Sequence, residues 1–354
     1  MYRRRITRKI WPISGKGAFP FLAEPEKTAA SAGEFGCIEA VCHDLLYRPE
    51  LVKLGAGDDG AVYVSPPGMD QVISTDTMVE GIHFTAETMD AADVGWKLCT
   101  ANFSDMAAMG AEPAQFVISA ALPKTLPLSW LEACYEGIRA ACRRYRVNLL
   151  GGDMTGSRQG VVLTGTVVGL VPSGTAVPRS GAREGDLLVL TGPVGDSAAG
   201  LEAIFRGRAR EFPELVSRHR RPVPRVEAGA VLREAGIRAL DDITDGLASE
   251  SHEVATASGQ DLILEKDRIP LSEEARRAGE AFGIDPLHWA FTGGEDYALL
   301  GAGPEEAVRR AAEQIPLTVI GRVAGPGGRV WLEEGGRLSL LPRCGYDHFK
   351  EETP

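Results

Sequence analysis

Apolar residues along the chain follow two patterns that predict different secondary structures. Residues 71–76, 114–122 and 161–171 form short runs rich in β-branched and small residues, which predict buried strands. Residues 130–145 instead repeat apolar side chains at helical spacing, which predicts an amphipathic helix. Residues 90–110 predict a second helix, built from small residues that let backbones approach closely. Since strands and helices mix without a strict strand–helix–strand order, the pattern favours an α+β fold over a doubly wound sheet.

The length and the position of breaks in the pattern predict two domains. A chain of 354 residues exceeds what one hydrophobic core usually accommodates. Residues 1–32 show no steady periodicity, which predicts a disordered N-terminal extension with order beginning near Gly33. A stretch rich in Pro, Ser and Gly follows Pro172. We therefore predict an N-terminal domain over residues 33–172 and a C-terminal domain over residues 173–350.

Composition and charge exclude several classes of protein. The net charge of −11 argues against a nucleic-acid binder, which needs a basic face. No apolar run is long enough to predict a membrane-spanning helix. The six cysteines include no Cys-x-x-Cys pair, and no signal peptide is recognisable, so we expect reduced thiols and a cytoplasmic protein.

Acidic residues recur beside Gly, Ser or Thr, at the ends of predicted strands or in the helix of small residues. They lie in residues 57–59, 74–76, 104–105, 151–153, 241–245 and 293–296. One such segment is usually a turn or a helix cap, but six in one chain favour a shared site. A buried carboxylate is costly unless it is paired or bound to metal, and few basic residues lie nearby in the sequence. Several Mg²⁺ ions with bound phosphate groups would satisfy these carboxylates.

Other sequence motifs narrow the chemistry further. The chain lacks the Walker A motif, the protein-kinase motifs and the Gly-x-Ser-x-Gly elbow of hydrolases. His83 is either a structural hydrogen-bonding residue or a substrate contact, since it closely follows Asp76. Arg179 is either a surface ion-pair residue or a bidentate phosphate ligand.

The same segments resemble the thiamine-monophosphate kinase family over about residues 33–349. The most specific matches are Asn102-Phe-Ser-Asp-Met-Ala-Ala-Met-Gly110 and Gly293-Gly-Glu-Asp-Tyr297. Gly57-Asp-Asp59, Val79-Glu-Gly-Ile-His-Phe84 and Gly345-Tyr-Asp-His-Phe349 also match. The wider superfamily includes aminoimidazole ribonucleotide synthetase, selenophosphate synthetase and a hydrogenase-maturation protein.

The resemblance implies a two-domain PurM-like fold and a reaction. The N-terminal domain would bind ATP and Mg²⁺ and pair with a second copy through its sheet, giving a homodimer. The C-terminal domain would be an α/β sandwich. The implied reaction converts thiamine monophosphate and ATP into thiamine diphosphate and ADP, by direct in-line transfer assisted by several Mg²⁺ ions.

The resemblance also implies a role for each matching residue. The Mg²⁺ ligands would be Asp59, Ser74, Thr75, Asp76, Asp105, Asp153, Asp242 and Asp245. The ATP contacts would be Gly152, Asp153, Arg179 and Thr244, and the thiamine contacts His83, Glu295 and Tyr346. We predict that Asp76, Asp105 and Asp153 hold Mg²⁺ on the ATP phosphates. A second set, Asp59, Asp242 and Asp245, would hold Mg²⁺ that draws the acceptor phosphate toward the γ-phosphate. No residue is implied as a general acid or base, since the acceptor is already a phosphate oxyanion.

Two alternatives remain open from the sequence. The chain is either another ATP-dependent enzyme of the same superfamily or a non-catalytic nucleotide- or divalent-ion-binding module. Selenophosphate synthetase would need a reactive Cys with a nearby Lys early in the chain, and neither Cys37 nor Cys42 has that setting. A non-catalytic module would keep the aspartates without turning over ATP.

Overall fold

The computed structural model describes residues 27–56, 59–346 and 348–349. Residues 1–26 of the predicted extension, and Asp58, lie outside this range. Helix α1 (Ala29–Val41) begins before Gly33, the predicted start of order. The cause is a capping box, in which Thr28 Oγ1 accepts from the Ser31 amide and Ser31 Oγ accepts from the Thr28 amide.

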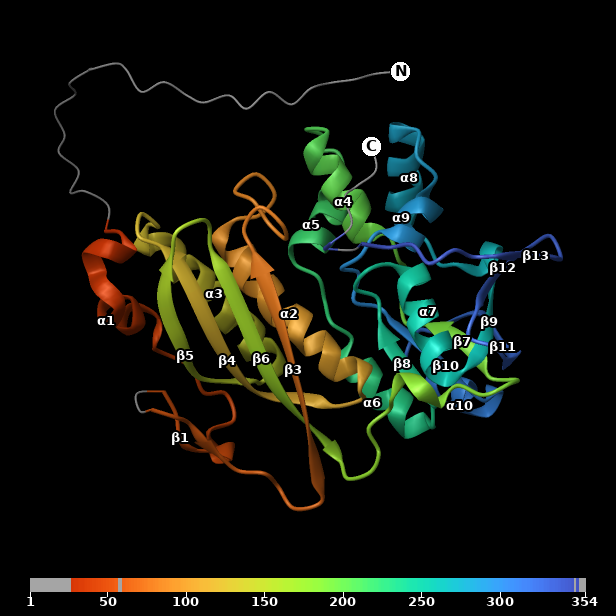
Figure 1. Cartoon of the computed structure of the whole chain (residues 1–354), viewed down its shortest axis with the longest axis horizontal. Coiled ribbons are helices and arrows are strands. Elements are labelled where there is room, and N and C mark those ends of the chain that lie inside the picture. The colour runs from red at the N-terminus through yellow and green to blue at the C-terminus, as the bar shows by residue number, and fades with distance from the viewer. Residues whose placement is uncertain (1–26, 57–58, 347, 350–354) are drawn as a thin grey trace.

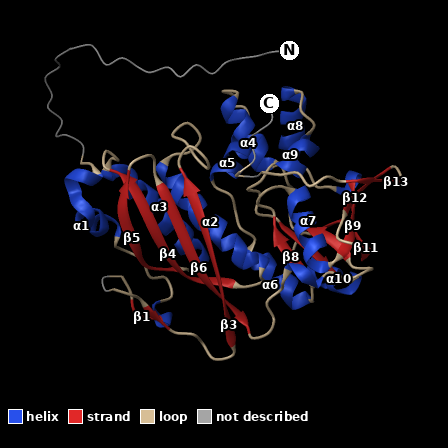
Figure 2. Cartoon of the chain, viewed as in Figure 1, coloured by secondary structure: helices blue, strands red, loops and turns tan. Residues whose placement is uncertain are grey.

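The N-terminal half is built on one four-stranded sheet (Figures 1 and 2). Its strand order is β3-β6-β4-β5, with β4 and β5 parallel and the other neighbours antiparallel. The strands are β3 (Met69–Val79), β4 (Glu112–Pro123), β5 (Asn148–Ser157) and β6 (Val162–Pro172). A separate hairpin precedes the sheet and consists of β1 (Val52–Leu54) and β2 (Val62–Tyr63), after the 3-10 turn Pro49–Leu51.

Two long helices, α2 (Ala91–Ala108) and α3 (Leu128–Tyr145), cover one face of this sheet (Figure 1). They pack backbone to backbone, because a Cβ on Gly95 would lie 1.9 Å from the carbonyl oxygen of Cys134. Gly229, on a C-terminal helix, approaches Ala107 of α2 just as closely, with 2.2 Å between a built Cβ and the Ala107 oxygen. The predicted close approach of backbones at this helix of small residues is therefore confirmed.

The C-terminal half contains a seven-stranded sheet of order β13-β12-β9-β11-β7-β10-β8. The strands are β7 (Leu187–Leu190), β8 (Ala239–Asp242), β9 (Gln260–Glu265), β10 (Leu299–Gly303), β11 (Thr318–Pro326), β12 (Val330–Glu334) and β13 (Arg337–Leu340). The helices are α4 (Asp196–Phe205), α5 (Pro213–Arg220), α6 (Val226–Ala235), α7 (Leu247–Ser258), α8 (Glu273–Phe282), α9 (Pro286–Thr292) and α10 (Glu305–Ala312). Short 3-10 turns occupy Arg179–Gly181 and Lys266–Arg268.

The two halves meet where α2 contacts α6 and the end of edge strand β8. One apolar core runs across the boundary, since Phe103 and Ile138 belong to the same cluster of buried residues as Leu232 and Leu240. This packing holds the carboxyl end of β8 close to β3 and α2. Within the described ranges, no helix is long and apolar enough to cross a membrane.

Candidate functional site

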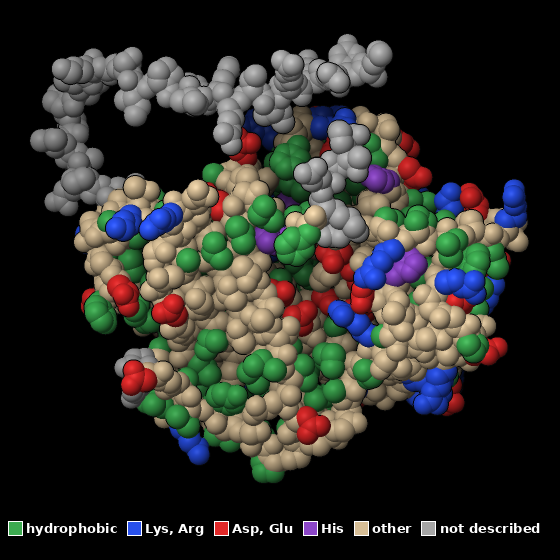
Figure 3. Space-filling view, viewed as in Figure 1, with side chains coloured by type: hydrophobic (Ala, Val, Ile, Leu, Met, Phe, Trp, Pro, Cys, Tyr) green, Lys and Arg blue, Asp and Glu red, His purple; other side chains and the backbone are tan. Residues whose placement is uncertain are grey.

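Four of the predicted aspartates gather where the two halves meet, and we call them the acidic cluster. They are Asp76 on β3, Asp105 on α2, and Asp242 and Asp245 at and after the end of β8. Ser74 Oγ donates to Asp105 Oδ2 at 2.5 Å. Figure 3 shows acidic side chains gathered in the hollow between the two halves. The structure therefore joins residues that lie more than 100 positions apart in the sequence.

Burial and mutual repulsion raise the pKa values of carboxyl groups in the acidic cluster. Burial, followed by the charge of Asp105, raises the pKa of Asp76 to about 7. Burial also raises the pKa of Asp242 well above its usual range, and the charges of Asp105 and Asp241 add to the effect. A cation entering the cluster would relieve this repulsion, so the cluster favours cation binding.

Two buried oxygens at the end of β8 have no hydrogen-bond partner among the described residues. They are Oδ2 of Asp241 and Oδ2 of Asp242. Asp241 Oδ1 accepts from Arg179 Nε at 2.8 Å, and the Arg179 side chain is half exposed. Buried carboxylate oxygens without partners are costly, and hard oxygens are the ligands that Mg²⁺ prefers. The donor set at this strand end therefore fits Mg²⁺.

The acidic cluster does not form a complete metal cage within the described part of the chain. No three His, Cys, Asp or Glu side chains there already converge in a metal-binding arrangement. Mg²⁺ is usually held by one or two carboxylates together with substrate phosphates and water. Pairs such as Asp76 and Asp105 suit a metal that arrives with a nucleotide.

The turn after β8 touches the turn that carries Glu295. Glu295 N donates to the carbonyl oxygen of Thr244 at 2.9 Å, and a Cβ on Gly294 would lie 1.8 Å from that same oxygen. Glu250 accepts from the Asp245 amide at 3.1 Å, and burial raises the pKa of Glu250 to about 9. Backbone contacts therefore hold Thr244 and Asp245 in place, and both residues are partly exposed.

The three predicted thiamine contacts also come together beside the acidic cluster. The His83 and His348 rings are 5.0 Å apart, and the His348 and Tyr346 rings are 4.8 Å apart. The Tyr346 amide donates to the carbonyl oxygen of Asp245 at 3.1 Å. A cavity of about 270 Å³ adjoins Tyr346 and His348, with Asp245 in its lining; His83 and Glu295 are not among the described residues that line it. Burial lowers the pKa of His83, while the nearby charge of Glu295 opposes that shift.

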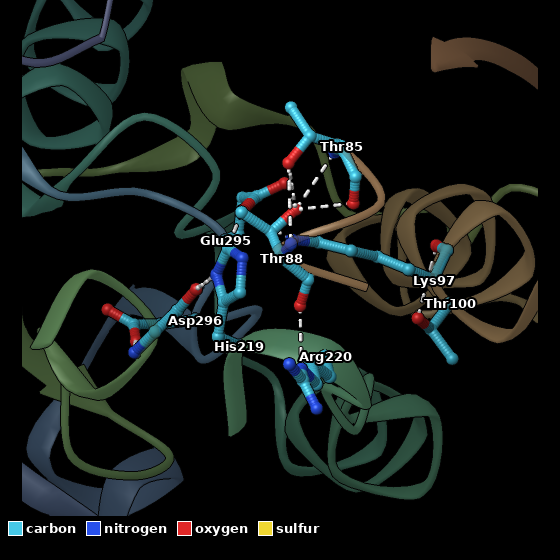
Figure 4. A network of polar contacts seen from close by, with 9 residues as sticks. Thr85, Thr88, Lys97, Thr100, His219, Arg220, Glu295 and Asp296 are labelled. Atoms are coloured by element: carbon cyan, nitrogen blue, oxygen red, sulfur yellow. Dashed lines mark hydrogen bonds and ion pairs between the residues drawn. The ribbon is translucent and has the colours of Figure 1, made fainter. Parts of the chain in front are cut away.

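Sequence reasoning missed a buried network behind Glu295 (Figure 4). Lys97 Nζ lies 2.5 Å from Glu295 Oε2, and the Lys97 side chain is only 1% exposed. His219 Nδ1 lies 3.7 Å from the same oxygen. The available signal was Lys97 itself, a charged residue between the apolar Val94 and Leu98 on the helix of small residues.

Four predicted site residues lie away from the acidic cluster within one chain, so the groupings of Asp153 and Asp59 with it stay predictions. Thr75 faces the opposite side of the sheet from Ser74 and Asp76, because side chains alternate along a strand, and its Oγ1 donates to Gly165 O at 2.7 Å. Gly152 and Asp153 lie on β5, at the opposite edge of the sheet from β3. Asp59 is exposed in the connection between β1 and β2.

The raised pKa values predict that the metal-free protein loses stability as pH rises. Asp76 and Asp241 have pKa values of about 7 and Glu250 of about 9, so the folded chain retains protons that the unfolded chain releases near pH 4. Unfolding thus becomes easier from about pH 4 to pH 7, and Glu250 extends the loss toward pH 9. Melting temperatures between pH 5 and 9, in EDTA and in Mg-ATP, test this.

We expect the melting temperature in EDTA to fall across that range and the gain from Mg-ATP to grow with pH. A melting temperature in EDTA that stays constant or rises between pH 5 and 8 would contradict this account of the cluster.

Comparisons with known proteins match both halves of the chain. Residues 57–171 match the family described as AIR synthase related protein, N-terminal domain, and residues 183–333 match its C-terminal domain. Thiamine-monophosphate kinase of Bacillus subtilis (strain 168) is 33% identical over 333 residues, covering 90% of this chain and 99% of the relative. The enzyme of that name from Escherichia coli (strain K12) is 37% identical with the same coverage. The solved structure of AaThiL complexed with AMPPCP and TMP has a TM-score of 0.74 and 32% identity, covering 90% of this chain and 97% of that chain.

Proposed function

The chain belongs to the thiamine-monophosphate kinase family and has its two-domain PurM-like α+β fold, and we propose that its acidic cluster directs phosphoryl transfer from ATP to thiamine monophosphate. The observation that carries this proposal is the meeting of Asp76 and Asp105 with Asp242 across the domain boundary. The relative solved with AMPPCP and TMP supports a nucleotide and thiamine monophosphate as the two substrates.

Asp76, Asp105 and Asp242 would hold Mg²⁺, with Ser74 and Asp245 beside them. Bound there, Mg²⁺ would neutralise charge on the phosphates of both substrates. The protein must also hold the mutually repelling phosphate groups of the two substrates in line for transfer. Arg179 is positioned to contact a phosphate from the rim, since its half-exposed guanidinium is anchored by Asp241. Thr244 supplies a hydroxyl at the same edge.

No general base is needed in this scheme. The acceptor phosphate of thiamine monophosphate is already an oxyanion at neutral pH, so its oxygen attacks without losing a proton to the protein. We therefore propose direct transfer, without a phosphorylated enzyme. His83, Glu295 and Tyr346 would bind the organic part of the substrate beside the cluster.

The uncovered face of the four-stranded sheet supports a homodimer that completes the site. On this face Ile73 of edge strand β3 is 69% exposed and Val117 of central strand β4 is 37% exposed, which leaves large apolar side chains uncovered. Thr75 and Asp153 lie on it near opposite edges. We propose that a second copy packs on this face and brings its Asp153 and Gly152 to the ATP that binds against Asp76 and Asp105.

Co-expression of two inactive variants tests this shared site. Asp105→Asn and Asp153→Asn should each inactivate the homodimer, but a mixed dimer would contain one site with both aspartates intact. If subunits mix freely, half of the dimers are mixed and recovered activity should be about a quarter of wild type. No recovery from a verified mixed dimer would show that Asp153 does not serve the partner's site.

Measured ADP release distinguishes this function from the alternatives. We expect release that requires both Mg²⁺ and thiamine monophosphate, with formation of thiamine diphosphate in equal amount. ATP turnover that does not depend on thiamine monophosphate would favour another enzyme of the superfamily. Nucleotide binding without turnover would favour a non-catalytic module. The described cysteines are all free thiols, and we propose that the reaction takes place in the cytoplasm.

A further inference from the structure

Glu295 is held by residues from both halves of the chain. Lys97 reaches it from α2, and His219 reaches it from α5. Among the described residues, the side-chain contacts of Glu295 all fall on one oxygen, Oε2. The backbone at Glu295 is left-handed, with φ of 65°, and its amide is tied to Thr244. Both the backbone and one carboxylate oxygen are therefore fixed.

The burial of Lys97 and His219 is not explained by a contribution to the stability of the fold. Lys97 is 1% exposed and His219 is 2% exposed, and an apolar pair would pack at such a place with less desolvation cost. His219 Nε2 is buried without a partner among the described residues, while its Nδ1 lies 3.2 Å from Ser197 Oγ. Burial lowers the pKa of His219 well below its usual range, with further effects from Lys97 and Arg220. Burial therefore disfavours a charge on His219, and Lys97, whose pKa burial lowers and Glu295 raises, is the closer ion-pair partner of Glu295.

We propose that Lys97 and His219 are positioning residues that orient Glu295, so that its second oxygen, Oε1, accepts a hydrogen bond from the amino-substituted ring of thiamine monophosphate. This inference rests on the proposed function, in which Glu295 contacts the organic part of the substrate. Lys97 Nζ occupies Oε2, so Oε1 is the carboxylate oxygen left to accept from a substrate amino group. The network thereby determines affinity for thiamine monophosphate and leaves ATP binding unaffected.

Lys97→Met tests the proposal, because Met fills the same buried volume without the charge. We expect KM for thiamine monophosphate to rise at least about tenfold, with KM for ATP and kcat within about twofold of wild type. Lys97→Arg, which keeps the charge, should recover part of the affinity. Arg139→Met is the matched control, since Arg139 is also buried, at 3% exposure, but lies on α3 and donates to Val41 O and Glu136.

A double variant separates positioning from a structural role. In the Glu295→Gln background, Lys97→Met should raise KM for thiamine monophosphate no further, because the carboxylate that it orients is gone. The double variant should also melt at a higher temperature than Glu295→Gln alone, since that single variant leaves Lys97 buried without its partner. The melting comparison keeps the test valid should Lys97→Met fold poorly by itself.

Two results would overturn the inference while leaving the kinase intact. One is an unchanged KM for thiamine monophosphate in folded Lys97→Met. The other is an equal rise in KM for thiamine monophosphate in Lys97→Met and Arg139→Met, with the effect of Lys97→Met multiplying that of Glu295→Gln in the double variant. A wild-type protein without thiamine monophosphate-dependent turnover would instead overturn the proposed function and this inference together.

Discussion

Asp105→Asn should lower kcat by about 10²-fold or more while the protein stays folded. The change removes one negative charge from the pair that Asp105 forms with Asp76, at the position proposed to hold Mg²⁺. It keeps the shape of the side chain, and the amide oxygen still accepts from Ser74 Oγ, now 2.5 Å from Asp105 Oδ2. Steady-state turnover at saturating ATP and thiamine monophosphate, over a range of Mg²⁺ concentrations, measures the effect.

Asp90→Asn is the matched control for this prediction. Asp90 caps the other end of the same helix, where its Oδ1 accepts from the Asp93 amide at 2.9 Å, and Asn is an equally good cap. The control should keep near-normal turnover. A turnover of Asp105→Asn within a few-fold of wild type would show that Asp105 is not a metal ligand.

Asp242→Asn should have opposite effects on activity and on stability. Asp242 is 2% exposed, its Oδ2 has no partner among the described residues, and burial with the charges of Asp105 and Asp241 raises its pKa. Removing that charge relieves repulsion in the metal-free protein, so its melting temperature at pH 8 should rise by about 2–5 °C. The same change removes a proposed metal ligand, so kcat should fall by about 10²-fold or more.

The pH dependence of the stability gain shows whether the gain comes from the charge of Asp242. Because burial raises the pKa of Asp242, the folded chain takes up a proton there more readily as the pH falls, so the gain from Asn should be smaller at pH 5 than at pH 8. Thermal melts in EDTA at pH 5 and pH 8 provide the comparison. An Asp242→Asn protein that is less stable than wild type at pH 8, or fully active, would contradict the description of this residue.

Much of the N-terminal domain could be predicted from the sequence, because its elements have strong patterns. The predicted helix over residues 130–145 corresponds to α3, and the predicted strand over residues 161–171 to β6. Helix α8 was not predicted, although its apolar and polar positions segregate strongly at helical spacing; its buried residues are only the small Ala275, Ala278 and Gly279. Helix α5 was also missed, because its eight residues are mostly polar and only its packing identifies it.

The acidic cluster could be predicted as a set of residue types but not as a geometry. Alternation along β3 already implied that Thr75 and Asp76 face opposite sides of the sheet. The place of Asp153, by contrast, depends on a strand order that the sequence does not specify. Asp296 is a cap rather than a ligand, since its Oδ1 accepts from the Ser197 amide at the start of α4.

The contacts of Lys97 and His219 depend on long-range packing, since α2 and α5 are far apart in the sequence. No local signal predicts that their side chains meet at Glu295. Sequence patterns therefore predicted many of the elements and the residue types of the site, and the structure was needed to show which side chains contact one another.

We propose that Asp76, Asp105 and Asp242 jointly hold the metal that accompanies ATP. Anomalous diffraction from crystals grown with Mn²⁺, a non-hydrolysable ATP analogue and thiamine monophosphate locates the metal directly. We expect Mn²⁺ peaks within coordination distance of carboxylate oxygens of all three residues, next to the nucleotide phosphates. Peaks bound only by phosphates and water, or by carboxylates elsewhere in the molecule, would contradict the account.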